Sequence, residues 1–184
     1  MSKVYAFMAD GSEEVELLSV VNVLLRGGQD VKLVSVTGRK EIDSAHHIKI
    51  RADYELSEID VSDGDVLFLP GGMPGTRNLG EDEALCKALL KAYEDGKHLA
   101  AICAAPSIFG KLGLLEGKKA TCFPGFEQEL TGAEYTHQGV ITDGRITTAR
   151  GLGYGLDLGL QLLRILAGEK KSQEIKQEIQ YDQI

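Results

Sequence analysis

The chain has 184 residues, of which 43% are hydrophobic and 26% charged, and its formal net charge is −8 at pH 7. This composition is that of an ordinary globular protein and excludes a disordered or fibrous one, so we expect one domain over residues 1–184. The acidic charge argues against nucleic acid and anionic membranes as partners, because lysine and arginine would have to neutralise their phosphates.

The start of the chain and its cysteines indicate a location. The first apolar run, Val4 to Ala9, is broken at Asp10, too early for a secretory signal, and no stretch is long enough to span a membrane. Cys86, Cys103 and Cys122 form no C-x-x-C pair and cannot all be bridged within one chain. A reduced compartment is typical of such usage, so the sequence predicts a cytoplasmic protein.

Short apolar runs alternate with longer amphipathic ones along the chain. Strands are predicted at Val4–Met8, Val31–Val36, Val66–Leu69 and Leu99–Ile102, with further strands at His47–Arg51 and within Thr136–Ala149. Helices are predicted over Glu13–Arg26 and Asp82–Tyr93, from Pro106, after Arg150 and over Ser172–Tyr181. Strands that alternate with helices of this length form right-handed β-α-β units. The pattern therefore predicts an α/β fold with a largely parallel sheet and helices on both faces.

Local signals mark some boundaries of these elements. Ser12 is a candidate N-cap for the first helix, and Gly27-Gly28 would end it. Asp143-Gly144 lies between two alternating runs and predicts a hairpin turn.

Three of the predicted strands end in segments that carry chemistry. They are followed by Ala9–Glu16, by Pro70–Gly75 and by Cys103. Ligands of open α/β sheets bind outside the carboxyl ends of the strands. If these three strands are neighbours, a carboxylate, free backbone N–H groups and a thiol converge at one edge of the sheet.

The segment around Cys103 has the pattern of a nucleophile elbow. An apolar strand runs into the cysteine, and the small residues Ala104 and Ala105 leave room for a sharp turn before Pro106 opens a helix. A thiol at a helix start faces the positive end of the helix, which favours the thiolate. The alternative is an ordinary buried cysteine, and this segment alone does not separate the two.

At this point the motifs resemble those of the ThiJ/PfpI superfamily, in its small DJ-one-like branch. The resemblance covers essentially the whole chain and rests on Gly11–Glu16, Leu69–Gly72, Ala101–Pro106 and Thr148–Gly151. It implies a single α/β domain of the flavodoxin-like, doubly wound type, which forms a homodimer and works with neither a cofactor nor a metal.

The resemblance also implies the roles of individual residues. Cys103 would be the nucleophile, and Glu16 its paired acid, protonated near neutral pH and hydrogen-bonded to the thiolate. The backbone N–H groups of Gly72 and Ala104 would stabilise an oxyanion. Without the resemblance, Glu16 is better interpreted as a first-turn carboxylate that complements the helix dipole, as the two preceding glutamates do.

The chain departs from the family pattern at its histidines. Relatives often carry a histidine just before a Tyr-Thr pair, where this chain has Glu134, and His137 follows the pair. On a strand Glu134 and Thr136 would share one face and Tyr135 and His137 the other, so no catalytic histidine is assigned. The protease-like branch has histidine directly after the cysteine, where this chain has Ala104.

The implied function is cysteine chemistry on small reactive carbonyls. The chain would be a glutathione-independent glyoxalase, or a deglycase that acts on methylglyoxal adducts of thiols and amines. The alternative is a redox-sensing or holdase-type stress protein that uses oxidation of Cys103, and a cysteine protease comes third. The sequence does not separate the carbonyl-directed enzyme from the redox or holdase protein, because a reactive, accessible cysteine is also the one that oxidises.

The remaining candidates favour structural roles. His46-His47 with Asp43 is interpreted as a solvated rim, not a metal site, because adjacent strand residues point to opposite faces. Gly151–Gly155 is predicted to pack a helix start and not to bind phosphate. Cys122 is expected in the core or an interface, and Cys86 on a packed helix face.

Overall fold

The computed structural model describes residues 1–181 and is built on a seven-stranded sheet with the order β10-β11-β7-β6-β1-β2-β5. The strands are β1 (Lys3–Met8), β2 (Asp30–Ser35), β5 (Tyr54–Glu55), β6 (Val66–Leu69), β7 (His98–Ile102), β10 (Val140–Asp143) and β11 (Ile146–Ala149). All neighbours pair in parallel except β10 and β11, which form an antiparallel hairpin at the predicted turn. Two small sheets join β3 (Glu41–Asp43) to β4 (Lys49–Arg51) and β8 (Lys119–Ala120) to β9 (Glu134–Tyr135).

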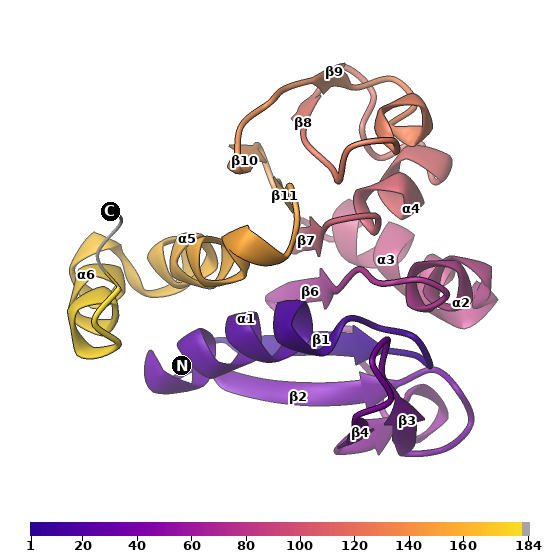
Figure 1. Ribbon diagram of the computed structural model, residues 1–184, viewed down its shortest axis with the longest axis horizontal. Helices are drawn as coiled ribbons and strands as arrows, with labels where there is room; N and C mark the ends of the chain where they lie inside the picture. Colours follow the sequence, from indigo (N-terminus) through magenta and orange to yellow (C-terminus); the bar gives the residue numbers. More distant parts are fainter. Residues whose placement is uncertain (182–184) are drawn as a thin grey trace.

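Helices cover both faces of this sheet, which confirms the predicted flavodoxin-like architecture. They are α1 (Glu14–Arg26), α2 (Gly75–Glu81), α3 (Glu83–Glu94), α4 (Pro106–Lys111), α5 (Gly155–Ala167) and α6 (Glu169–Glu178), with the 3-10 turns η1 (Leu56–Glu58), η2 (Glu127–Glu129) and η3 (Leu152–Tyr154). Figure 1 shows α5 and α6 on one side of the sheet and α3 and α4 on the other. None of the helices in residues 1–181 is long and apolar enough to cross a membrane.

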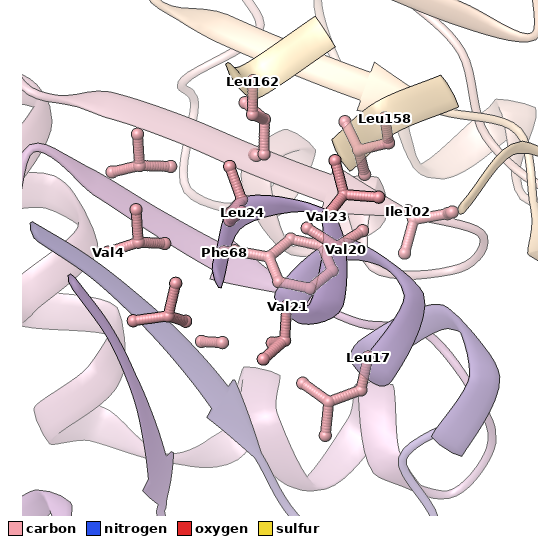
Figure 2. Packing of buried hydrophobic residues seen from close by; sticks show 14 of the residues in the cluster. Val4, Leu17, Val20, Val21, Val23, Leu24, Phe68, Ile102, Leu158 and Leu162 are labelled. Carbon is pink, nitrogen blue, oxygen red and sulfur yellow. The ribbon is translucent and has the colours of Figure 1, made fainter. Parts of the chain in front are cut away.

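The central strands are buried on both faces. Along β1, Val4 and Ala6 join the core under α1 and α5, whereas Tyr5 and Phe7 join the core under α3 and α4. In Figure 2 the Phe68 ring of β6 lies among side chains of α1, with Leu158 and Leu162 of α5 above. Burial on both faces explains why these strands are continuous apolar runs in the sequence.

Two glycines bring α5 unusually close to α1. A Cβ atom on Gly155 would lie 2.2 Å from Ser19 Oγ, and one on Gly159 would lie 2.8 Å from Val23 Cβ. The Gly151–Gly155 segment therefore packs a helix start, as predicted. The same contact carries η3, just before α5, to the first turn of α1.

The N-cap predicted for the first helix is wrong. Helix α1 begins at Glu14, and its N-cap is Glu13, whose carboxylate accepts the Glu16 N–H at 2.6 Å. Ser12 Oγ instead accepts the Ala9 N–H at 3.0 Å. Ser12 thereby closes the turn that follows β1, and Glu13 caps the helix in its place.

Other boundaries differ by a few residues. The last helix, α6, spans Glu169–Glu178 and not Ser172–Tyr181, because its first turn is polar and gives no apolar signal. Helix α3 begins at Glu83, with Asp82 as its N-cap. Helix α2 and strands β3, β5, β8 and β9 were not predicted as separate elements; all five are short.

The start of α2 packs against the turn after β1, and we expect Gly75→Ala to destabilise the fold. The new Cβ would lie 2.3 Å from Ser12 N and 2.5 Å from Gly11 C, and backbone atoms cannot move aside as a flexible side chain can. Urea denaturation should show a loss of about 1–3 kcal/mol, typical of overpacking. Gly153→Ala is the control, since a Cβ there meets nothing within 4 Å. Equal stability of the two variants would contradict this packing.

Candidate active site

Three neighbouring parallel strands place the residues of the candidate site at one edge of the sheet. In the order β7-β6-β1, the carboxyl ends of all three strands lie together. The segments that follow them carry Cys103 after β7, Gly71 and Gly72 after β6, and Glu16 in the first turn of α1 after β1. The predicted convergence of a thiol, backbone amides and a carboxylate is thus present.

Cys103 has the backbone conformation of a nucleophile elbow. Its φ is 65°, a left-handed value that is strained for a residue with a Cβ. Its backbone N–H donates to Ala149 O at 2.9 Å, and its carbonyl accepts the Phe123 N–H at 2.7 Å. These bonds to two other segments hold the turn, and they leave the side chain half-buried at the sheet edge.

Glycine is required where the β6 loop passes between the two reactive groups. A Cβ on Gly71 would lie 2.6 Å from Cys103 Cβ and 2.7 Å from Glu16 Oε2. Gly72 has a φ of 87°, and a Cβ there would lie 2.5 Å from Glu13 N. Only a chain without side chains at these positions lets the backbone N–H groups approach both the sulfur and the carboxylate.

Backbone amides lie close to each member of the pair. The Glu16 side chain, 1% exposed, accepts the Gly71 N–H at 3.0 Å, and the Leu152 amide also lowers its pKa. The Gly72 and Ala104 amides act in the same direction on the Cys103 thiol, whose pKa they lower. An anion on either side chain is therefore favoured by nearby backbone donors.

Burial and mutual repulsion hold a proton within this pair. Burial raises the pKa of the Glu16 carboxyl to about 7, and the charge of Glu13 adds to the shift. Burial also raises the pKa of the Cys103 thiol to about 12, followed by the repulsion of the Glu16 anion and the hydrogen bond to it. The Gly72 and Ala104 amides oppose this rise without reversing it. Between about pH 7 and pH 12 the pair therefore holds one proton.

The sequence predicted that the helix start lowers the pKa of the Cys103 thiol. This prediction is wrong while Glu16 is ionised. Helix α4 has only 6 residues, so its dipole is weak against the burial of the sulfur and the neighbouring anion. The pKa of Glu16, raised to about 7, leaves the carboxyl partly protonated near neutral pH, but beside a protonated thiol and not the expected thiolate. When Glu16 holds the shared proton, the repulsion disappears and its O–H donates to a thiolate. The nucleophile thus arises by proton transfer within the pair.

The other predicted candidates lie apart from this pair. His137 is exposed and meets the Tyr135 ring with centroids 4.9 Å apart, which agrees with their placement on one face. Cys122 is fully buried, and burial raises its pKa to about 12. Cys86 is half-buried and donates to Gly80 O. Asp43 pairs with Lys49, not with the histidines.

Sequence reasoning missed the two amides that hold Glu16, those of Gly71 and Leu152. The Leu152 N–H reaches Glu16 only because α5 packs closely on α1, a long-range contact that no local motif reveals. The same turn lines an open groove of about 310 Å³ together with Phe123, Pro124, Arg150 and Tyr154, and neither Cys103 nor Glu16 is among its lining residues. A groove of this volume suits a small ligand.

Comparison with known proteins identifies relatives over nearly the full length. The model of the DJ-1/PfpI family matches residues 2–165. Protein DJ-1 homolog B of Arabidopsis thaliana is 42% identical over 94% of this chain, which spans only 40% of that longer protein. A Caenorhabditis elegans protein named glutathione-independent glyoxalase DJR-1.2 is 26% identical, with 90% of this chain and 89% of that protein covered. The structure of oxidized DJ-1 from Toxoplasma gondii superposes with a TM-score of 0.94 and 28% identity over both full chains.

The shared proton predicts how the reactivity of Cys103 depends on pH. Its rate of alkylation should rise around pH 7, as the pair loses its first proton, well below the pKa of about 12 that burial gives the thiol beside an ionised Glu16. In Glu16→Gln the rise should move to higher pH, because the amide cannot take the thiol's proton. Glu83→Gln, an exposed first-turn carboxylate of α3, is the control. An unchanged profile in Glu16→Gln would show that Glu16 does not hold the proton.

Proposed function

The chain belongs to the DJ-1/PfpI family, and from this premise we propose that it carries out cofactor-free cysteine chemistry on small reactive carbonyls. The reaction is that of a glutathione-independent glyoxalase, with methylglyoxal and similar 2-oxoaldehydes as substrates. The observation that carries the proposal is the convergence of the Cys103 elbow, the buried Glu16 carboxyl and the Gly71-Gly72 backbone at one edge of the sheet.

The reaction begins with proton transfer from the thiol to Glu16. The Cys103 thiolate adds to the aldehyde carbon, a C–S bond forms, and the carbonyl π electrons move to the oxygen. The Gly72 and Ala104 N–H groups, which until then favour the sulfur anion, stabilise this oxyanion. Glu16 donates its proton to the oxygen, and the product is a hemithioacetal.

The rearrangement also needs a group that gives and takes protons. The Glu16 carboxylate removes the proton from the former aldehyde carbon, and the electron pair of the C–H bond moves to the adjacent carbonyl to give an enediolate. The hydroxyl proton passes to the oxygen of the adjacent carbon, and Glu16 returns its proton to that carbon, which leaves the thioester of a 2-hydroxy acid. Water then cleaves the C–S bond and releases the hydroxy acid and the thiol. Methylglyoxal and water give lactate, with no external oxidant or reductant.

Deglycation follows from the same chemistry. Early methylglyoxal adducts of thiols and amines are hemithioacetals and hemiaminals, and these release the aldehyde to the Cys103 thiolate. The sulfur is half-buried and not fully enclosed, so such small groups can reach it. The name of the Caenorhabditis elegans relative supports the glyoxalase reaction, although it reflects 26% identity.

A redox-sensing or holdase-type role is the second candidate, supported by the oxidized state of the Toxoplasma gondii relative. Peroxide would take two electrons from the thiolate to give a sulfenate and water, and a second peroxide would give a sulfinate. The donors that face the sulfur would bind the new oxygen atoms. A cysteine protease is less well supported, because Ala104 follows the cysteine where the protease-like branch has histidine.

The proposed setting is the cytoplasm, with a second copy of the chain as the macromolecular partner. Exposed apolar side chains on α1 support a homodimer, since Val15 and Leu25 are 47% and 52% exposed. The net charge of −8 argues against nucleic acid and anionic membranes as partners.

Substitutions in the pair should abolish or reduce the consumption of methylglyoxal in the absence of glutathione. Cys103→Ala and Cys103→Ser should both be inactive, because serine lacks a usable anion at neutral pH. Glu16→Gln should lose roughly 10²–10⁴-fold in turnover, the usual worth of general acid–base catalysis. The measurement is the rate of lactate formation by metal-free protein.

The matched controls are Cys86→Ala and Glu83→Gln, which change the same residue types away from the site. Both should keep wild-type rates. Wild-type turnover in Glu16→Gln, or substantial activity in Cys103→Ala, would refute the proposed mechanism.

Mild peroxide should oxidise Cys103 before the other two cysteines. Cys103 is half-buried and can pass its proton to Glu16, whereas Cys122 is fully buried. Burial, followed by the charges of Asp82 and Glu83, raises the pKa of Cys86, which within residues 1–181 has no carboxyl partner of the Glu16 kind. Peptide mapping by mass spectrometry should find added oxygen on Cys103 first. Earlier oxidation of Cys122 would contradict the site assignment. If Cys103 oxidises first and the protein does not turn over methylglyoxal, the redox role is favoured.

A further inference from the structure

A second cluster of ionisable side chains lies at the start of α1. Glu13 and Glu14 are 8% and 6% exposed, and His46 reaches them from the turn between β3 and β4. His46 Nδ1 lies 2.8 Å from Glu14 Oε1 and 3.8 Å from Glu13 Oε1. One ligand atom from each of the three residues lies within 4.8 Å of the others. The cluster therefore brings two carboxylates and an imidazole to one point.

The charges of this cluster are not balanced. Within residues 1–181 neither carboxylate forms an ion pair with a lysine or an arginine, and His46 is their only basic partner. Nearby cations are engaged elsewhere, Arg39 with Asp10 and Lys49 with Asp43. One imidazole can supply at most one positive charge to two neighbouring buried carboxylates, and an uncompensated charge is costly in a poorly solvated position.

The Glu14 side chain supplies an independent sign of a missing ligand. It is only 8% exposed, and its Oε2 is buried without a hydrogen-bond partner. The Ser44 hydroxyl approaches this carboxylate and accepts the Ile48 N–H at 3.0 Å. Oε1 of the same carboxylate contacts His46, so the unpartnered Oε2 belongs to a side chain that already faces the cluster.

The distances fit a small tetrahedral cation. Zinc binds histidine nitrogen and carboxylate oxygen at about 2.0–2.2 Å, which holds its ligands roughly 3.4 Å apart. The two measured separations, 2.8 and 3.8 Å, lie on either side of this value. The His46 side chain is 69% exposed, so it can shift by half an ångström without disturbing the core. Glu13 is fixed, because its other oxygen caps the Glu16 N–H.

We propose that Glu13, Glu14 and His46 bind a zinc ion, with water in the fourth position. The mixture of imidazole and carboxylates favours zinc over magnesium, which requires an octahedral shell of oxygen atoms. The ion would balance the two buried charges and tie the β3–β4 turn to the start of α1. Neither Cys103 nor Glu16 is a ligand of this site, although a bound cation would offset the Glu13 charge that raises the pKa of Glu16.

The test is zinc binding by the purified full-length chain, measured by calorimetry and by the shift of the melting temperature. Because the Cys103 thiol is a competing zinc ligand, the same titration is made with Cys103→Ala. We expect one zinc per chain in both proteins, a higher melting temperature with zinc, and no response to magnesium.

Ligand variants decide which residues hold the ion. Replacing a residue that only supports a metal ligand lowers metal affinity by roughly 10–100-fold. His46→Ala removes a ligand itself, so its zinc affinity should fall by more than this, and the same is expected of Glu14→Gln. His47→Asn is the control, because His47 adjoins His46 at a φ of 62°, a conformation that asparagine tolerates. His46 is exposed, so its replacement tests the site even if Glu14→Gln fails to fold. No zinc binding by the parent chain, or unchanged affinity in His46→Ala, would overturn the proposal.

Discussion

The site depends on one proton shared between two buried side chains. Glu16 is 1% exposed and Cys103 half-buried, so each anion is costly and the two repel each other. Burial raises the pKa of both groups, to about 7 and about 12, which leaves one proton in the pair over the physiological range. Two backbone amides face each side chain, so the proton can move between them without leaving either anion unsolvated. A nucleophile and its acid thus form in a single step.

This arrangement explains features of the fold that seem unrelated in the sequence. Gly71 must lack a side chain because its backbone passes between Cys103 and Glu16. Gly155 must lack one because α5 has to approach α1 closely enough for the Leu152 N–H to reach Glu16. The strained φ of Cys103 is held by hydrogen bonds from two other segments. Each constraint costs stability locally, and each contributes one donor or one side chain to the pair.

The sequence predicts the parts of this structure that depend on local pattern. Continuous apolar runs predicted the central strands, and the elbow around Cys103 followed from small residues on either side of a strand end. Long-range packing decided the rest. Ser12 was expected to cap α1 but closes the preceding turn, so Glu13 takes its place. His46 was considered with Asp43, yet the β3–β4 turn carries it to Glu14 instead. The thiol pKa was misjudged because burial and a neighbouring anion are not visible in sequence.

The most direct test of the shared proton is to observe both partners in one sample. Carbon-13 NMR of the Glu16 carboxyl, assigned with Glu16→Gln, reports its protonation, and ultraviolet absorbance assigned with Cys103→Ala reports the thiolate. Between about pH 7 and pH 12 the account predicts an ionised Glu16 beside a protonated Cys103 thiol, with one proton in the pair. Ionisation of both groups, or protonation of both, throughout this range would contradict it.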